Sequence, residues 1–213
     1  MTSTPPLDIS PAAVSPILEH LGPLFGQYDV LFCDIWGVVH DGKKAYPGAN
    51  EALPRFRAGG GTVILVTNAP MPSDEVARVC DSKGVGRDVW DVIVSSGDIA
   101  LTDIAEKHYT RLHRIGRPGF DDLFFKRCPG DATSIAEADA IVCTGLQDER
   151  KETAEMYRAR LIEPASRGLP FVCANPDLAV HVGHELLQCA GAIAAIYEDL
   201  GGPVSWAGKP HRS

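Results

Sequence analysis

The sequence of 213 residues lacks the features that mark membrane-spanning and disulfide-stabilised proteins. No apolar run is long enough to cross a membrane. The six cysteines form no C-x-x-C pair and mostly lie in apolar segments, which argues against a disulfide framework and favours a reducing cytoplasm. The residues after Met1 contain no basic segment followed by an apolar one, so we expect no signal peptide.

Positive charge is also scarce. The chain has 20 lysines and arginines against 28 aspartates and glutamates, a net charge of −8. Without a basic stripe to neutralise phosphates, nucleic acid is excluded as the main partner. An acidic protein can still bind an anionic substrate where the site itself is locally positive.

Short apolar segments alternate with helical segments along the chain. The expected strands cover residues 28–33, 62–66, 89–95, 140–144 and 171–174. Because these segments are apolar throughout, the pattern predicts an α/β protein whose parallel sheet is covered by helices on both faces. The character changes near Arg111, where a second α/β unit begins, and a helix is expected over residues 186–200.

Three polar residues stand at or just beyond the ends of apolar strands: Asp34, Thr67 and Lys209. The carboxyl ends of parallel strands lie side by side, so these groups should converge. A carboxylate that attacks phosphorus, with a hydroxyl and an ammonium to stabilise the phosphoryl oxygens, suits phosphoryl transfer.

The order and spacing of these residues resemble the haloacid dehalogenase (HAD) superfamily, class IIA, its NagD-like branch with a large type-two cap. The matching segments are Asp34 in the first motif, Thr67-Asn68 in the second, Lys209 within Gly208-Lys209-Pro210 in the third, Tyr46-Pro47-Gly48-Ala49 after the flap, and Ala174-Asn175-Pro176-Asp177 in the cap. The likeness extends from Tyr28 to His211.

The resemblance implies a Rossmann-like parallel-sheet core with an inserted α/β cap. We expect the core to comprise residues 1–108 and 202–213, and the cap residues 109–201. The sequence stops at Ser213, directly after a strand and a turn. We therefore expect that the C-terminal part, with the acidic residues of the family's fourth motif, is missing.

The function implied by the resemblance is Mg²⁺-dependent hydrolysis of a small phosphorylated metabolite. Asp34 would form an aspartyl-phosphate, Thr67 and Asn68 would orient the phosphoryl group, and Lys209 would neutralise it. In the cap, Asn175 and Asp177 would face the active site and help to select the substrate. The resemblance leaves the oligomeric state open, although members of this class often pair through their caps, so a homodimer is one expectation.

The resemblance implies two ligands for Mg²⁺, the Asp34 side chain and the backbone carbonyl of Trp36. The fourth-motif ligands would lie beyond Ser213, so we expect weak metal binding by this chain. Trp36 is also expected to contact the substrate, through an indole N–H that can donate a hydrogen bond.

Trp36 occupies the position where the family usually has a second aspartate, which protonates the leaving group and activates water. Loss of such general acid–base help costs about 10²–10⁴-fold in rate. Two alternatives follow: hydrolysis of another bond, such as carbon–halogen, or a catalytically impaired binding or regulatory protein. Asp41 either replaces the missing acid or, with Gly42, makes the turn of a hairpin.

Overall fold

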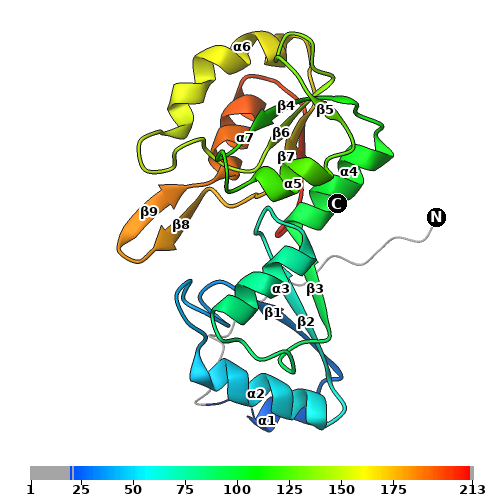
Figure 1. The fold of residues 1–213 in the computed structure, drawn as a ribbon, viewed down its shortest axis with the longest axis vertical. Coiled ribbons are helices and arrows are strands. Elements are labelled where there is room, and N and C mark those ends of the chain that lie inside the picture. Colours follow the sequence, from blue (N-terminus) through cyan, green and yellow to red (C-terminus); the bar gives the residue numbers. More distant parts are fainter. Residues whose placement is uncertain (1–19, 21, 212–213) are drawn as a thin grey trace, which may run out of the picture.

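The computed structural model describes residue 20 and residues 22–211, which form two α/β units, each built on its own parallel sheet (Figure 1). The first unit contains α1 (Gly22–Phe25), β1 (Val30–Asp34), α2 (Pro47–Ala58), β2 (Thr62–Thr67), α3 (Ser73–Ser82) and β3 (Val92–Ser95). Its strands follow the order β1-β2-β3. The expected α/β class with parallel sheets is confirmed.

The second unit has five parallel strands in the order β10-β7-β6-β4-β5 and an antiparallel hairpin, β8–β9. Its elements are α4 (Ser96–Glu106), β4 (Arg111–Ile115), α5 (Asp122–Arg127), β5 (Asp131–Ala132), β6 (Ala140–Cys143), the 3₁₀ helix η1 (Ala154–Tyr157), α6 (Arg158–Ser166), β7 (Phe171–Cys173), β8 (Ala179–Val182), β9 (Glu185–Gln188), α7 (Ala190–Asp199) and β10 (Val204–Trp206). Within the described residues, no helix combines the length and the apolar character that a bilayer crossing requires.

The central strands β6 and β7 of the second sheet are buried on both faces, as their continuous apolar sequences predict. Alternate residues of β6 and β7 contribute to two separate buried clusters. One cluster packs against η1, α6 and α7, and the other against α4 and α5. On the first face, the fully buried rings of Phe171 and Tyr197 lie 5.0 Å apart, and the Tyr197 hydroxyl donates to the Leu169 carbonyl at 2.6 Å.

The first sheet is covered on one face only, so the expectation of two covered faces is wrong for this sheet. Val63 and Leu65 of β2 are fully buried beneath α2 and α3. On the opposite face, Phe32 of β1 is 70% exposed, and Val92 of β3 is 50% exposed. In the described part of the chain this face remains open to solvent, and Asp34, which follows Phe32 by two residues, lies on the same face.

The expected domain boundaries at residues 108 and 201 both separate elements that pack together. Helix α4 contributes Ala100 and Ile104 to the buried cluster beneath the second sheet. Strand β10 pairs in parallel with β7, so it extends the second sheet instead of the first. We therefore propose that the units divide after Ser95 and after Trp206. Residues 1–19, 21 and 212–213, which the expected core also includes, lie outside the described residues.

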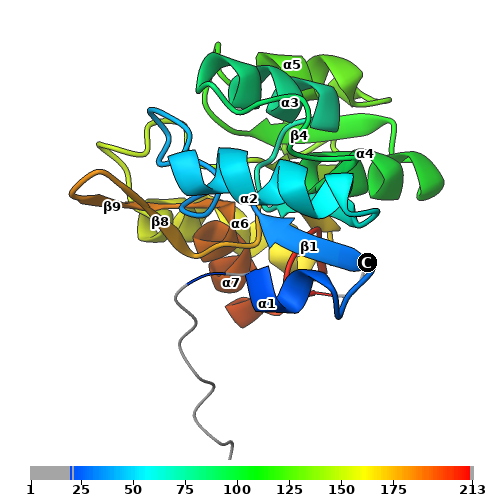
Figure 2. The same cartoon turned by 90° about the horizontal axis from the view of Figure 1, so that it is seen from below.

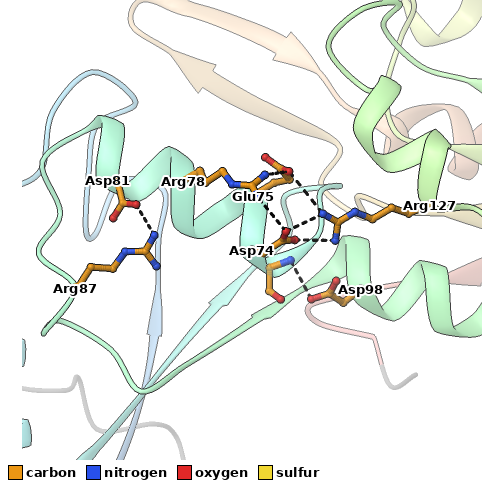
Figure 3. Close-up of polar contacts among 8 residues, drawn as sticks. Asp74, Glu75, Arg78, Asp81, Arg87, Asp98 and Arg127 are labelled. Carbon is orange, nitrogen blue, oxygen red and sulfur yellow. Dashed lines mark hydrogen bonds and ion pairs between the residues drawn. The ribbon is translucent and has the colours of Figure 1, made fainter.

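An ion-pair cluster joins the two units near their junction (Figure 3). Arg127 at the end of α5 makes a bidentate contact with Asp74 in α3, at 2.8 and 2.7 Å. Close by, the Asp98 carboxylate of α4 accepts a hydrogen bond from the Ser73 backbone N–H at 3.0 Å. Exposed pairs of this kind contribute about 0.2–1 kcal/mol each, so they orient the units more than they stabilise them.

Candidate active site

Asp34 and Lys209 meet where the two units face each other. Asp34 is the last residue of β1, and Lys209 follows β10 of the other unit. The Lys209 ammonium donates to Asp34 Oδ1 at 2.7 Å and to the Val66 carbonyl at 3.1 Å. Both side chains are about half exposed, so the carboxylate is paired with a cation and still accessible.

Thr67 ends the neighbouring strand and lines the same cleft. It is buried, and its Oγ1 accepts a hydrogen bond from the Ala69 N–H at 3.1 Å. This bond holds the turn that follows β2 and leaves the hydroxyl hydrogen available as a donor.

Asn68 ties the two units together. Its Oδ1 accepts from the Lys209 N–H at 2.9 Å, while its Nδ2 donates to the Lys209 carbonyl at 3.0 Å and to Asp177 Oδ1 at 2.8 Å. Gly208 permits this approach, because its φ is +105° and a Cβ there would lie 2.7 Å from Asn68 Oδ1. The Asn68 amide group is therefore committed to holding Lys209 and Asp177.

Asn175 and Asp177 form the turn that follows β7. The Asn175 side chain accepts a hydrogen bond from the Asp177 N–H at 3.0 Å, which is an Asx turn. Both residues line the cleft, and Asp177 is linked directly to Asn68. The structure thus brings the two expected cap residues to the same cleft as Asp34.

Trp36 reaches from the first unit to the β8–β9 hairpin of the second. Its indole Nε1–H donates to the His181 carbonyl at 3.2 Å. Figure 2 shows the hairpin beside the loop that follows β1. The ring also lies against Gly42, where a Cβ would approach within 2.5 Å of it. Trp36 therefore forms part of the cleft wall and holds the hairpin.

Asp41 does not line the cleft and stabilises the turn formed by residues 41–44. Its Oδ1 accepts hydrogen bonds from the backbone N–H groups of Lys43 and Lys44, both at 2.8 Å. These bonds lower the pKa of Asp41. Asp41 is not among the cleft-lining residues, so the geometry favours its role in the turn over that of a replacement acid.

His40 is buried beside this turn. Its Nδ1 accepts a hydrogen bond from the Gly42 N–H at 3.0 Å, and its ring packs edge-on against Trp36. Burial lowers the pKa of His40, which favours the neutral imidazole that this hydrogen bond requires.

The cleft between the units has a volume of about 550 Å³. The polar groups around Asp34 form part of its lining. The second unit contributes polar side chains and also apolar ones, namely Phe120, Leu146, Val180, Val182 and Leu187. Such a volume admits an organic group much larger than a phosphate.

Sequence reasoning missed the polar residues that the second unit places in this cleft, including Arg117, Asp121, Thr144 and Glu149. Arg117 forms an ion pair with Glu149, and its guanidinium lies over the Phe120 ring. The sequence did contain a pattern that indicates Arg117 and Thr144 as site residues, because they follow the carboxyl ends of β4 and β6. The strand-end argument that identified Asp34 applies equally to the second sheet.

Asp121 is buried at the base of the cleft. Its Oδ2 accepts from the Arg117 N–H at 2.7 Å and from Thr144 Oγ1 at 2.8 Å. Gly116 leaves the necessary room, because a Cβ there would collide with Thr144 Oγ1. Burial raises the pKa of Asp121 despite these bonds.

The raised pKa predicts a specific pH dependence of stability. At pH values between the pKa of Asp121 in the unfolded chain and its higher pKa in the folded protein, the folded protein binds more protons than the unfolded chain. The contribution of Asp121 to the free energy of unfolding therefore falls as pH rises through this interval. Asp121→Asn retains an oxygen acceptor for both hydrogen bonds and cannot ionise. Urea unfolding at several pH values should therefore show the variant gaining stability relative to wild type as pH rises through that interval. A constant difference between the two proteins would contradict this.

The described residues supply only part of a metal site. The Asp34 carboxylate lines the cleft, but nowhere in residues 22–211 do three or more His, Cys, Asp or Glu side chains gather to hold an ion. Mg²⁺ requires near-octahedral oxygen coordination and keeps several waters. The present donors therefore fit one side of such a site.

Comparisons with known proteins agree with this architecture. Residues 31–127 match the model of a haloacid dehalogenase-like hydrolase family. A hydrolase of the haloacid dehalogenase-like family from Brucella suis 1330 is 43% identical, with a TM-score of 0.85, over 92% of this chain and 75% of that one. No curated protein matches the sequence significantly.

Two more distant structures share the fold. A possible sugar phosphatase from Cytophaga hutchinsonii is 22% identical, with a TM-score of 0.73, over 92% of this chain and 72% of that one. NagD from Escherichia coli K-12 is 23% identical, with a TM-score of 0.59, over 85% and 69% respectively. The Brucella match carries the assignment, since it combines high identity with coverage of most of both chains. This chain belongs to the haloacid dehalogenase-like hydrolase family and has a NagD-like fold.

Proposed function

We propose that this hydrolase cleaves small phosphate esters through an aspartyl-phosphate on Asp34. The observation that carries the proposal is the contact between Lys209 Nζ and Asp34 Oδ1 at the carboxyl end of β1. An accessible carboxylate beside a fixed cation is placed to attack an anionic phosphorus centre. The fold shared with a possible sugar phosphatase supports the same reaction class.

The neighbouring groups have distinct roles in this reaction. Asp34 attacks phosphorus, and the Lys209 ammonium stabilises negative charge on the phosphoryl oxygens. The Thr67 hydroxyl, whose oxygen is held by the Ala69 N–H, donates its hydrogen to one of those oxygens. Asn68 acts by holding Lys209, because both hydrogens of its side-chain amide already bond to other acceptors.

The substrate in this proposal is a small phosphorylated metabolite. Its organic part lies against the apolar side chains that line the cleft. The cleft volume of about 550 Å³ and its lining by Phe120, Val180 and Leu187 support this placement. We propose a reducing cytoplasm as the location, and the six cysteines are all free thiols in the structure.

Mg²⁺ is the proposed cofactor, with Asp34 and the Trp36 carbonyl as its protein ligands. When bound, it would offset repulsion between the carboxylate and the anionic phosphate. Because no group of three or more His, Cys, Asp or Glu side chains gathers around an ion site among the described residues, we expect weak binding. Titration calorimetry should give a shallow, unsaturated isotherm with Mg²⁺ and a smaller one with Asp34→Asn. Tight one-to-one binding by wild type would refute this.

The reaction is tested by measuring phosphate release from a panel of phosphate esters, in parallel with halide release from haloacids. We expect phosphate release, together with acid-stable trapping of phosphate on the peptide that contains Asp34. Halide release without phosphate release would favour the dehalogenase-like alternative. Neither release, with beryllium fluoride still binding at Asp34, would favour a ligand-binding or regulatory protein.

A further inference from the structure

Hydrolysis of an alkyl phosphate by Asp34 needs a group that donates a proton to the leaving oxygen, and residue 36 does not provide one. The Trp36 indole cannot exchange a proton near neutral pH. Its N–H is also engaged by the His181 carbonyl of the hairpin. Another cleft residue must therefore carry the proton if the proposed function holds.

Four carboxyl groups among the described residues line the cleft: Asp34, Asp121, Glu149 and Asp177. Asp34 is the nucleophile. Asp121 is buried, and its hydrogen bonds come from the Arg117 backbone and Thr144 of the second unit, not from residues that hold Asp34 or Lys209. Glu149 is held in an ion pair with Arg117 of the second unit.

Asp177 differs from the other three because it is bonded directly to the residues that hold the reaction centre. Its Oδ1 accepts from Asn68 Nδ2, Asn68 holds the Lys209 backbone on both sides, and the Lys209 ammonium contacts Asp34. Its backbone is fixed by the Asn175 side chain. The described residues place no hydrogen bond on Asp177 Oδ2, which leaves that oxygen free to exchange a proton with a ligand in the cleft.

We propose that Asp177 is the general acid and base of the reaction, in place of the residue that Trp36 substitutes. This inference rests on the proposed function of Asp34.

The two half-reactions balance as follows. In the first, an Asp34 oxygen bonds to phosphorus, the bond from phosphorus to the ester oxygen breaks, and the Asp177 proton passes to that oxygen to release an alcohol. In the second, the Asp177 carboxylate takes a proton from water while the water oxygen attacks phosphorus. The Asp34 carboxylate and inorganic phosphate are released, and Asp177 is again protonated.

The leaving group distinguishes this role from a structural one. A 4-nitrophenolate ion leaves without protonation, whereas an alkoxide requires a general acid. Asp177→Asn keeps an oxygen that can accept from Asn68, so it removes the proton and retains the link. Rapid-mixing measurements should be made on wild type and on this variant, with 4-nitrophenyl phosphate and with a simple alkyl phosphate.

For Asp177→Asn we expect first-turnover release of 4-nitrophenolate within a few-fold of wild type, followed by slow turnover. Alkyl phosphate cleavage should fall by about 10²–10⁴-fold. Asp41→Asn serves as the matched control, because it retains the oxygen that accepts from the Lys43 and Lys44 N–H groups. In this variant the cleavage rates of both substrates should stay at the wild-type level.

Equal loss of the first turnover with both substrates would overturn the acid role and leave Asp177 as a positioning residue. Unchanged cleavage of the alkyl phosphate would overturn any role. Cleavage of the phosphate esters by Asp34→Asn, or no cleavage by wild type, would overturn the proposed function itself. These outcomes differ from those that would overturn only the role of Asp177.

Discussion

Replacing Asp34 by asparagine should lower the rate of phosphate release by at least about 10⁴-fold, because the amide cannot form the acyl-phosphate bond. The fold should survive, since the amide oxygen can still accept a hydrogen bond from Lys209. Phosphate release at saturating substrate measures the rate. Urea unfolding measures the free energy of unfolding, which should change by less than about 1 kcal/mol because the pair is half exposed.

Asp29→Asn is a suitable control for this substitution. Asp29 directly precedes β1, and its contact with the Thr62 N–H uses the backbone carbonyl, not the side chain. The control removes the same charge near the same strand and should keep wild-type turnover. If Asp34→Asn retained more than a tenth of the wild-type rate, the aspartyl-phosphate mechanism would be wrong.

Strands β6 and β7 were well predicted from the sequence. β6 and β7 are apolar at every position and buried on both faces, which is the pattern of a parallel sheet. The first sheet has equally apolar strands, yet Phe32 is exposed. Composition reports what a strand is able to bury, whereas the covering of each face depends on elements that are distant in sequence.

The predicted helix over residues 186–200 is wrong in its first part. Residues Glu185–Gln188 form β9, and α7 begins only at Ala190. The turn at Gly183, with φ of +65°, reverses the chain and pairs β9 with β8. Leu186 and Leu187 fit either a helix or a strand, and cross-strand pairing decides between them.

At the site, the strand-end argument predicts that Asp34, Thr67 and Lys209 converge at one sheet edge. Asp34 and Thr67 do end neighbouring strands of the first sheet, whereas Lys209 reaches Asp34 from the second sheet. The roles of these residues remain predictions. The bonds from Asn68 to Lys209 and Asp177 span 141 and 109 residues. No local pattern encodes such contacts, because they depend on how the two units dock.

Substituting Lys209 by methionine should lower the catalytic efficiency by about 10²–10³-fold, the usual effect of losing one fixed group that stabilises transition-state charge. Methionine keeps most of the side-chain length but provides no cation for the phosphoryl oxygens. The backbone groups of Lys209 that bond to Asn68 are unaffected, so the link to the second unit should persist. The value of kcat/KM and the amount of phosphate trapped on Asp34 should both fall in this variant, and both are to be measured.

The charge itself can be separated from the geometry by two further variants. Lys209→Arg keeps a cation but replaces a compact ammonium that touches both Asp34 and Val66 with a planar group, so it should recover only part of the lost activity. Lys151→Met removes an exposed surface lysine whose ion pair within the described part of the chain is with Asp148, and this variant should behave as wild type. If Lys209→Met and Lys151→Met were equally active, Lys209 would be a structural link between the units. Its contact with Asp34 would then carry no argument for phosphoryl transfer.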